Sequence, residues 1–291
     1  MNRETTQFWL EDRLFRGLLA LALALPYRWR VPLMGWLMRR LIGPLAGYRC
    51  RALENLALVW PDRPAAERQR IASAALDNAG RTLIENYSTA DLRALGRRTR
   101  AEGPGVAALD RARAEGRPVI LVTGHFGNYE AARATLVAQG CDIGGLYRPM
   151  RNPFFNAHYV QTMEAFGGPV FPQGRAGTAG FVRHLKSGGQ LVLLFDQRAP
   201  GVWQDFLGHP VETALSAPQL ALRYGADLIP FYATRQADGL SFRVELEAPI
   251  PHSTAEEMVL AMNRSLEARV IATPGQWFWV HRRWKNAPEQ G

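Results

Sequence analysis

The chain of 291 residues is long enough for one large α/β domain or two small ones. Hydrophobic residues make up 47% of it and charged residues 21%, which excludes an intrinsically disordered chain and predicts a sizeable buried core. The 35 basic residues exceed the 26 acidic ones, and the net charge of +9 favours anionic partners: phosphate groups, acidic proteins, anionic lipid or nucleic acid. Cys50 and Cys141, the two cysteines, form no zinc framework or disulfide scaffold and fit a reducing compartment.

The N-terminal part of the chain carries two apolar runs, 15–26 and 31–42, that basic residues interrupt. Each run is shorter than the roughly 20 apolar residues that a membrane-spanning helix needs. The segment 27–30 (YRWR) follows the first run where a signal peptide would have small residues, which argues against export. Tryptophans beside arginines are typical of a helix in the membrane interface, so we expect residues 1–47 to attach to a membrane surface. A buried helical hairpin and a single tilted span are the alternatives, and Arg28 and Arg30 make the span costly.

Beyond residue 47 the hydrophobic patterns alternate between helix and strand. Apolar residues that recur every four positions from Ile71 to Leu83 predict an amphipathic helix from about Pro64 to Tyr87. A polar, arginine-rich connection with a short helix is expected over 90–114. Apolar or alternating runs predict strands over 117–123, 143–147, 170–171, 190–195, 228–234 and 242–247, and helices are expected over 128–139, 153–166, 177–185, 216–224 and 254–271. The alternation predicts an α/β fold with a mostly parallel or mixed central sheet flanked by helices, and a site at the carboxyl ends of its strands.

The first of these strands leads into the segment 124–130 (GHFGNYE). His125 is expected in the turn at the carboxyl edge of the sheet, and Glu130 in the first turn of the next helix. The flanking glycines let the backbone bend sharply and a substrate approach closely. A carboxylate beside one imidazole nitrogen fixes the tautomer and makes the other nitrogen a better base. The pattern alone leaves two interpretations open, a general base made of His125 and Glu130 or a polar turn, and it disfavours a metalloprotease because no second histidine lies one helical turn away.

His-x-x-x-x-Glu after a strand resembles the motif of the glycerolipid-type acyltransferase superfamily, whose commoner form ends in Asp. The chain as a whole resembles the bacterial lipid A biosynthesis acyltransferases, the lauroyl and myristoyl transferases of lipopolysaccharide assembly. The segments that carry the resemblance occur in the family's order: 51–56 (RALENL), 59–62 (VWPD), 124–130, 147–153 (YRPMRNP), 195–197 (FDQ) and 205–208 (DFLG). The resemblance covers essentially the whole length. The segment 205–208 departs from the family's usual Pro-Phe-Phe-Gly, which leaves the shape of the acyl pocket open.

The resemblance implies that residues 48–291 form an acyltransferase domain. Its reaction would move a fatty acyl chain from an acyl carrier protein thioester, or a coenzyme A thioester, to a hydroxyl of a lipid A precursor in late acylation. His125 would take the proton of that hydroxyl, and Glu130 would orient His125. The sequence has no Gly-x-Ser-x-Gly nucleophile elbow and its cysteines lie away from the motif, so direct transfer without an acyl-enzyme is expected. Neither a cofactor nor a metal ion is expected.

A basic cluster of Arg148, Arg151 and Asn152 follows the second predicted strand. Two guanidiniums there can clamp a lipid phosphate through paired hydrogen bonds, and the alternative is a pair of solvated loop arginines. Asp196 follows the most apolar strand, and the family match makes it a site residue. Its role is either catalytic support or a structural one, such as pairing with one of those arginines. Gln197 is expected in the same substrate-binding region.

Two further segments suggest ligand binding on first inspection. Residues 174–180 (GRAGTAG) lack the Gly-Lys-Ser/Thr ending of a phosphate-binding loop, so a flexible helix start is favoured. Residues 277–285 (WFWVHRRWK) combine aromatic and basic side chains, which suits single-stranded nucleic acid. We expect instead that the aromatic residues dock on the core and the cations face lipid phosphate, so nucleic acid is not an expected partner.

Two classes of function follow from the sequence. The first is an O-acyltransferase at the cytoplasmic face of the inner membrane, whose partners are membrane lipid, a lipid A precursor and acyl carrier protein. Its net charge would hold anionic membrane and steer the acidic carrier. Another glycolipid or a lysophospholipid is the alternative acceptor. The second class is a non-catalytic membrane-surface binding protein, in which His125 and Glu130 are only turn residues.

Overall fold

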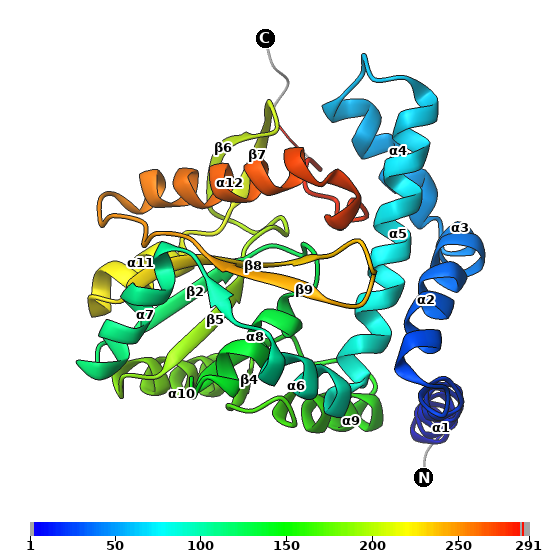
Figure 1. The fold of residues 1–291 in the computed structure, drawn as a ribbon, viewed down its shortest axis with the longest axis horizontal. Coiled ribbons are helices and arrows are strands. Elements are labelled where there is room, and N and C mark those ends of the chain that lie inside the picture. The colour runs from blue at the N-terminus through cyan, green and yellow to red at the C-terminus, as the bar shows by residue number, and fades with distance from the viewer. Residues whose placement is uncertain (1–2, 286, 288–291) are drawn as a thin grey trace.

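The computed structural model describes residues 3–285 and 287. A central seven-stranded sheet has the order β1-β9-β8-β2-β5-β3-β4, and β6 and β7 form a separate antiparallel hairpin. The strands are β1 (Ala101–Glu102), β2 (Val119–Thr123), β3 (Ile143–Tyr147), β4 (Val170–Pro172), β5 (Gln190–Leu194), β6 (Val202–Phe206), β7 (His209–Thr213), β8 (Asp227–Arg235) and β9 (Phe242–Leu246). Neighbouring strands are parallel except for β8 and β9. The predicted α/β fold with a mostly parallel, mixed sheet is confirmed (Figure 1).

Helices cover both faces of the sheet. They are α1 (Arg3–Leu23), α2 (Tyr27–Leu37), a π-helix η1 (Met38–Ile42), α3 (Gly43–Leu45), α4 (Tyr48–Val59), α5 (Ala65–Tyr87), α6 (Thr89–Arg98), α7 (Pro104–Ala114), α8 (Tyr129–Ala138), α9 (Pro153–Glu164), α10 (Arg175–Lys186), α11 (Ser216–Tyr224), α12 (Ala255–Ala272) and a 3₁₀ helix η2 (Pro274–Gln276). Side chains of β2 alternate between two cores, with Ile120 and Val122 on the side of α10, α11 and α12 and Val119 and Leu121 on the side of α6, α7, α8 and α9. This alternation is expected of a strand that is buried on both faces.

The predicted strands and helices agree closely with those observed, and the differences lie in the most polar parts of the chain. The segment 90–114 holds most of α6, the short strand β1 and α7, where one short helix was expected. The hairpin β6–β7 was not predicted. Its two-residue turn consists of Leu207 and Gly208, both with positive φ, which matches the right-handed twist of paired strands. The segment 205–208, where the chain departs from the family pattern, therefore belongs to this turn.

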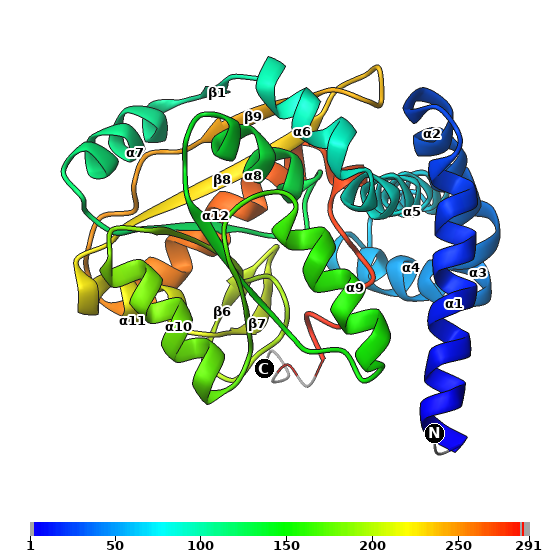
Figure 2. The ribbon, with the colours of Figure 1, turned by 90° about the horizontal axis from the view of Figure 1, so that it is seen from below.

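The N-terminal helices lie on the outer side of α5 (Figure 1). Helix α2 packs closely on α5 because Gly80 has no side chain, and a Cβ there would collide with the backbone of Met34. Helix α1 lies on the outside of the molecule next to α9 (Figure 2), and the side chains of Leu14, Leu18 and Leu21 are exposed. The alternative of a buried hairpin is therefore wrong for α1. Within residues 3–285 and 287, no helix combines the length and apolar character needed to cross a membrane.

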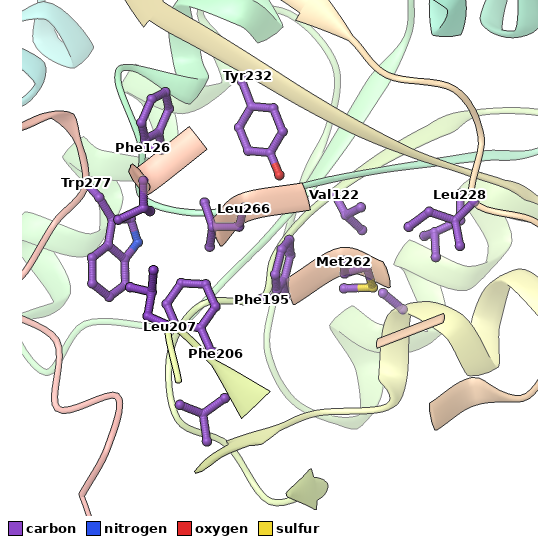
Figure 3. Packing of buried hydrophobic residues seen from close by; sticks show 14 of the residues in the cluster. Val122, Phe126, Phe195, Phe206, Leu207, Leu228, Tyr232, Met262, Leu266 and Trp277 are labelled. Atoms are coloured by element: carbon purple, nitrogen blue, oxygen red, sulfur yellow. The ribbon is translucent and has the colours of Figure 1, made fainter. Parts of the chain in front are cut away.

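The C-terminal aromatic segment docks on the core, as predicted. Trp277, Trp279 and Trp284 are buried in the cluster of which Figure 3 shows a part. Arg283 is buried as well, and its guanidinium donates hydrogen bonds to Thr213 Oγ1 at 2.7 Å and to two backbone carbonyls. Burial lowers the pKa of Arg283 to about 10. The prediction that the cations of this segment face lipid phosphate is therefore wrong for Arg283, whose two terminal NH groups donate inside the protein.

Candidate active site

The loop that carries His125 is held from both sides by backbone hydrogen bonds. The N–H of Gly127 donates to the carbonyl of Gln276 at 2.9 Å, and the N–H of Phe278 donates to the carbonyl of His125 at 3.0 Å. Gly127 has a φ of 56°, and a Cβ there would collide with the carbonyl oxygen of Ala233 on β8. Only glycine fits this position, so the loop between β2 and α8 takes one shape and fixes where the imidazole lies.

The sheet brings Asp196 to the imidazole from the neighbouring strand. Strands β2 and β5 are parallel, with Thr123 opposite Leu194, so His125 and Asp196 both lie just beyond the same edge. Asp196 Oδ1 is 2.7 Å from His125 Nδ1, and Oδ2 accepts hydrogen bonds from the His125 backbone N–H at 2.7 Å and from Trp277 Nε1 at 2.9 Å. Both carboxylate oxygens are therefore committed to His125 and Trp277.

The electrostatics of this pair favour an ionised carboxylate beside an imidazole that has one free nitrogen. Asp196 is fully buried, which by itself raises the pKa of its carboxyl, but the charge and hydrogen bonds of His125 outweigh burial and hold that pKa well below its ordinary value. A carboxylate at Nδ1 selects the tautomer with the proton on Nδ1. Nε2 then carries a lone pair, and the His125 side chain is 25% exposed. The arrangement can accept a proton from a bound hydroxyl.

Glu130 does not orient His125, so that prediction is wrong. Across the described residues, no hydrogen bond joins Glu130 to His125; the Glu130 carboxylate pairs with Arg133 at 3.2 Å, one helical turn along α8. Arg133 is buried and donates a further hydrogen bond to the carbonyl of Gly167 at 2.6 Å. Glu130 pairs with Arg133 because a guanidinium that is buried away from water is costly unless a carboxylate balances its charge. Glu130 supplies it and still borders the same cavity as His125.

His125 and Tyr129 line two cavities at the carboxyl edge of the sheet. The larger has a volume of about 350 Å³ and a mixed wall, in which apolar residues such as Leu146, Met163 and Val192 lie beside charged and polar ones. The smaller has a volume of about 200 Å³ and lies against α5 and the C-terminal segment; its lining includes Ala75, Ala79, Leu83, Trp277 and Phe278. The imidazole therefore borders two separate spaces that two substrates can occupy.

The other predicted site residues divide between the larger cavity and the surface. Arg148 and Gln197 line the larger cavity with His125. Arg151 has an 85% exposed side chain that pairs with Glu4 of α1. Asn152 caps α9 by accepting hydrogen bonds from the N–H groups of Phe154 and Phe155, and its amide donates to the carbonyl of Phe8. Arg148 and Arg151 are thus not brought together as a clamp, and Asp196 is a partner of His125 instead of a substrate contact.

His281 is a site residue that the sequence analysis missed, because its segment was assigned as a whole to core docking. Its ring centroid lies 4.5 Å from that of His125, and its buried Nε2 has no hydrogen-bond partner in the described part of the chain. Burial lowers the pKa of His281 to about 4, so its imidazole is neutral near pH 7. Donor atoms of His125, Asp196 and His281 lie within 4.8 Å of one another, but the Asp196 oxygens already accept N–H donors, which suits proton transfer better than ligation of a metal ion.

A buried polar network behind the loop was also missed, since its members come from three distant segments. Arg235 at the end of β8 pairs with Glu85 of α5 and donates from Nε to Asn78 Oδ1 at 2.8 Å. Asn78 in turn donates to the carbonyl of Gly127 at 3.0 Å, and Asn128 donates to Glu85 at 2.8 Å. The network ties α5 and β8 to the His125 loop, and each buried polar group in it has a partner.

The fold and the site define an α/β protein with a buried carboxylate–histidine pair beside two substrate-sized cavities. The model of the family described as bacterial lipid A biosynthesis acyltransferase matches residues 2–286, so the chain belongs to that family. The resemblance stated from the sequence motifs is thereby confirmed. Membership makes the chain an O-acyltransferase of lipid A biosynthesis.

Individual relatives are similar over most of their length. A lipid A biosynthesis acyltransferase from Haemophilus influenzae is 26% identical over 88% of this chain and 81% of its own. The lipid A biosynthesis lauroyltransferase of Escherichia coli is 27% identical over 81% of this chain and 78% of its own. A phosphatidylinositol mannoside acyltransferase from Mycobacterium tuberculosis is 24% identical over 79% of this chain and 75% of its own.

Proposed function

We propose that this protein transfers a fatty acyl chain from an acyl carrier protein thioester to a hydroxyl of a lipid A precursor, in a late acylation step, with His125 as the general base. The observation that carries the proposal is the contact between His125 Nδ1 and the buried Asp196 carboxylate, which leaves Nε2 free beside the two cavities. Coenzyme A thioester is the alternative donor. Both carriers, acyl carrier protein and coenzyme A, are anionic. The net charge of +9 supports the acidic protein as the donor, because it would steer that protein toward this chain.

The proposed transfer is a single displacement at the thioester carbon. The acceptor hydroxyl gives its proton to His125 Nε2 as its oxygen bonds to the carbonyl carbon. The carbon–sulfur bond then breaks, and the imidazolium returns the proton to the leaving thiolate. Asp196 stabilises the transient positive charge and holds the ring. A well-placed base contributes about 10²–10⁴-fold, and the positioning of both substrates supplies more.

The cysteines support direct transfer over an acyl-enzyme. Cys141 is buried in the connection between α8 and β3. Burial raises the pKa of its thiol to about 11, so almost no thiolate exists at neutral pH. Cys50 lies exposed on α4, and neither cysteine lines a cavity with His125. In this proposal the larger cavity receives the acyl chain, because it offers more volume and has Leu146, Met163 and Val192 in its wall, and the acceptor approaches from the smaller one.

We also propose that residues 1–47 attach the protein to the cytoplasmic face of the inner membrane. Leu14, Leu18 and Leu21 project from α1 at helical spacing, and Arg13 and Arg16 flank them. Such a face suits acyl chains beside phosphate headgroups. Changing the three leucines to serine should weaken binding to phosphatidylglycerol vesicles in a sedimentation assay. Unchanged binding would contradict attachment through α1, and the division at residue 47 stays a prediction.

A second acceptor class has one specific observation in its favour. The Mycobacterium tuberculosis relative is named for acylation of a phosphatidylinositol mannoside, a glycolipid other than lipid A. Another phosphorylated glycolipid is therefore the alternative acceptor for this chain. Supplying both acceptors with one donor and comparing kcat/KM separates the two.

The direct test uses purified protein in detergent micelles with acyl carrier protein carrying a labelled acyl chain and a lipid A precursor. The wild type should form the acylated lipid, and His125→Ala should lower the rate by at least about 10²-fold. The matched control is His209→Ala, since His209 lies on the β6–β7 hairpin and lines neither cavity with His125. A folded His125→Ala variant that keeps the wild-type rate would remove the base assignment. Wild-type protein that binds precursor but never transfers would favour the binding-only class.

A further inference from the structure

A large cleft lies beside the small cavity that His125 lines. Its volume is about 1090 Å³, and its walls come from α2, η1, α4, α5 and η2. Asn78 and Gln276 line both this cleft and the His125 cavity, so the two spaces share one wall. The cleft therefore adjoins the cavity that the imidazole borders.

The cleft holds an excess of unpaired positive charge. Arg39, Arg49 and Arg70 line it, and across residues 3–285 and 287 none of the three pairs with a carboxylate. Arg49 and Arg70 are exposed and Arg39 is half-buried, and like charges gathered in a concave surface raise its potential and thereby favour binding of an anion. Arg133 and Arg283 differ from these three in that their terminal NH groups donate to acceptors of the protein, although the Nε of each also has no hydrogen-bond partner among the described residues.

The other charges in the cleft are already neutralised. Arg81 donates from Nε to Asp77 at 2.5 Å, and Arg235 pairs with Glu85. Asp77 is the one carboxylate among the described lining residues. Three guanidiniums therefore remain available to an anionic ligand.

Arg39 is the most constrained of the three. It lies on the π-helix η1, a rare backbone form that often marks functional sites. Its Nε is buried and has no hydrogen-bond partner among the described residues. A buried guanidinium donor without a partner is costly. A phosphate oxygen is an acceptor that would satisfy it with the planar geometry that arginine favours.

The rim of the cleft points to a ligand that is also a lipid. Trp36 lines the cleft and is 49% exposed, and Trp29 and Leu33 of the same helix are exposed as well. A phosphate bound by the arginines would thus lie between the exposed apolar side chains of α2, which suit a membrane surface, and the smaller cavity that His125 lines. A flat protein–protein docking surface needs no such concavity, which disfavours an acidic protein as the occupant.

We infer that this cleft binds a phosphate group of the acyl acceptor and thereby places the acceptor hydroxyl at His125. The inference rests on the proposed function, because it takes the acceptor to be a phosphorylated glycolipid. The sequence predicted that Arg148 and Arg151 bind phosphate, but the fold separates their side chains. The inference assigns this role to Arg39, Arg49 and Arg70 instead.

The test compares two double variants that remove the same charge. Arg39→Gln with Arg70→Gln empties the cleft of two guanidiniums, and Arg97→Gln with Arg98→Gln, on the surface of α6, is the control. Each protein is assayed with the phosphorylated precursor and with the same glycolipid after phosphatase treatment. The cleft variant should raise KM for the phosphorylated acceptor by at least about tenfold with little change in kcat, and the control should stay within about twofold of the wild type. The treated acceptor should show no difference between the proteins.

Three results would overturn the inference: an unchanged KM for the phosphorylated acceptor, an equal loss in both double variants, or a rise in KM for the donor alone, which would assign the cleft to the acyl carrier protein. Arg39→Lys with Arg70→Lys keeps the charge and should restore part of the affinity, which excludes a folding defect as the cause. Binding to phosphatidylcholine vesicles with and without the precursor is measured in parallel. If the wild type transfers no acyl chain, the proposed function fails, and precursor-dependent binding that the cleft variant loses would still uphold the phosphate site.

Discussion

Replacing Asp196 with asparagine tests the carboxylate–histidine pair with almost no change in shape. The carboxylate accepts three hydrogen bonds: from His125 Nδ1, the His125 backbone N–H and Trp277 Nε1. An amide has one oxygen, and two N–H donors already converge on the Oδ2 position. The amide oxygen will therefore stay there, and its NH₂ group will face Nδ1. His125 must then present a lone pair at Nδ1 and carry its proton on Nε2, where it cannot act as a base.

The expected loss for Asp196→Asn is a factor of about 10²–10⁴ in kcat, or about 3–5 kcal/mol in the barrier. KM for both substrates should stay within about twofold, since Asp196 lines neither cavity. Initial rates with acyl carrier protein as the donor measure kcat and KM. In urea unfolding, the free energy of unfolding should fall by about 1–3 kcal/mol because the charged hydrogen bonds are lost. Asp110→Asn, an exposed aspartate on α7, is the matched control. A folded Asp196→Asn protein that keeps a third of the wild-type kcat would refute the tautomer argument.

Three further predictions concern the surroundings of the pair. Glu130→Ala leaves Arg133 buried without its carboxylate, and urea unfolding should show a loss of about 3–5 kcal/mol; an unchanged midpoint would contradict the structural role. Gly127→Ala forces a side chain into positive φ against Ala233, so both unfolding temperature and transfer rate should fall, and a normal rate would show that the loop tolerates another shape. The pKa of His281 falls from 6.5 to about 4 on folding, so the unfolded chain binds more protons in that window. Stability should therefore drop by up to roughly 3 kcal/mol as pH falls from 6.5 to 4; His281→Gln should remove that part of the slope, and an identical slope in both proteins would contradict its burial as neutral imidazole.

The parts of the fold with strong periodicity could be predicted from the sequence. The continuous apolar runs of β2 and β5 and the four-residue spacing from Ile71 to Leu83 required no knowledge of the tertiary structure. The hairpin β6–β7 was not predicted because most residues of its strands are exposed or half-buried, so the sequence has no strong apolar pattern there. Its turn also contains Leu207, which is rare at positive φ.

The candidate site shows where local reasoning stops. His125 and Asp196 were both placed at the carboxyl edge of the sheet, but the sequence does not state that β5 lies beside β2. Proximity along the chain therefore favoured Glu130, five residues from His125, over Asp196, which is 71 residues away. Glu130 is claimed by Arg133 one turn further along the same helix. His281 reaches the imidazole only because its segment folds back over the loop.

Mass analysis of lipid A from a strain that lacks this protein tests the central claim most directly. The account predicts lipid A with one fatty acyl chain missing, restored by the wild-type gene and not by His125→Ala expressed at the same level. The missing mass would also give the length of the transferred chain. Unaltered lipid A in the deletion strain, or full restoration by His125→Ala, would contradict it.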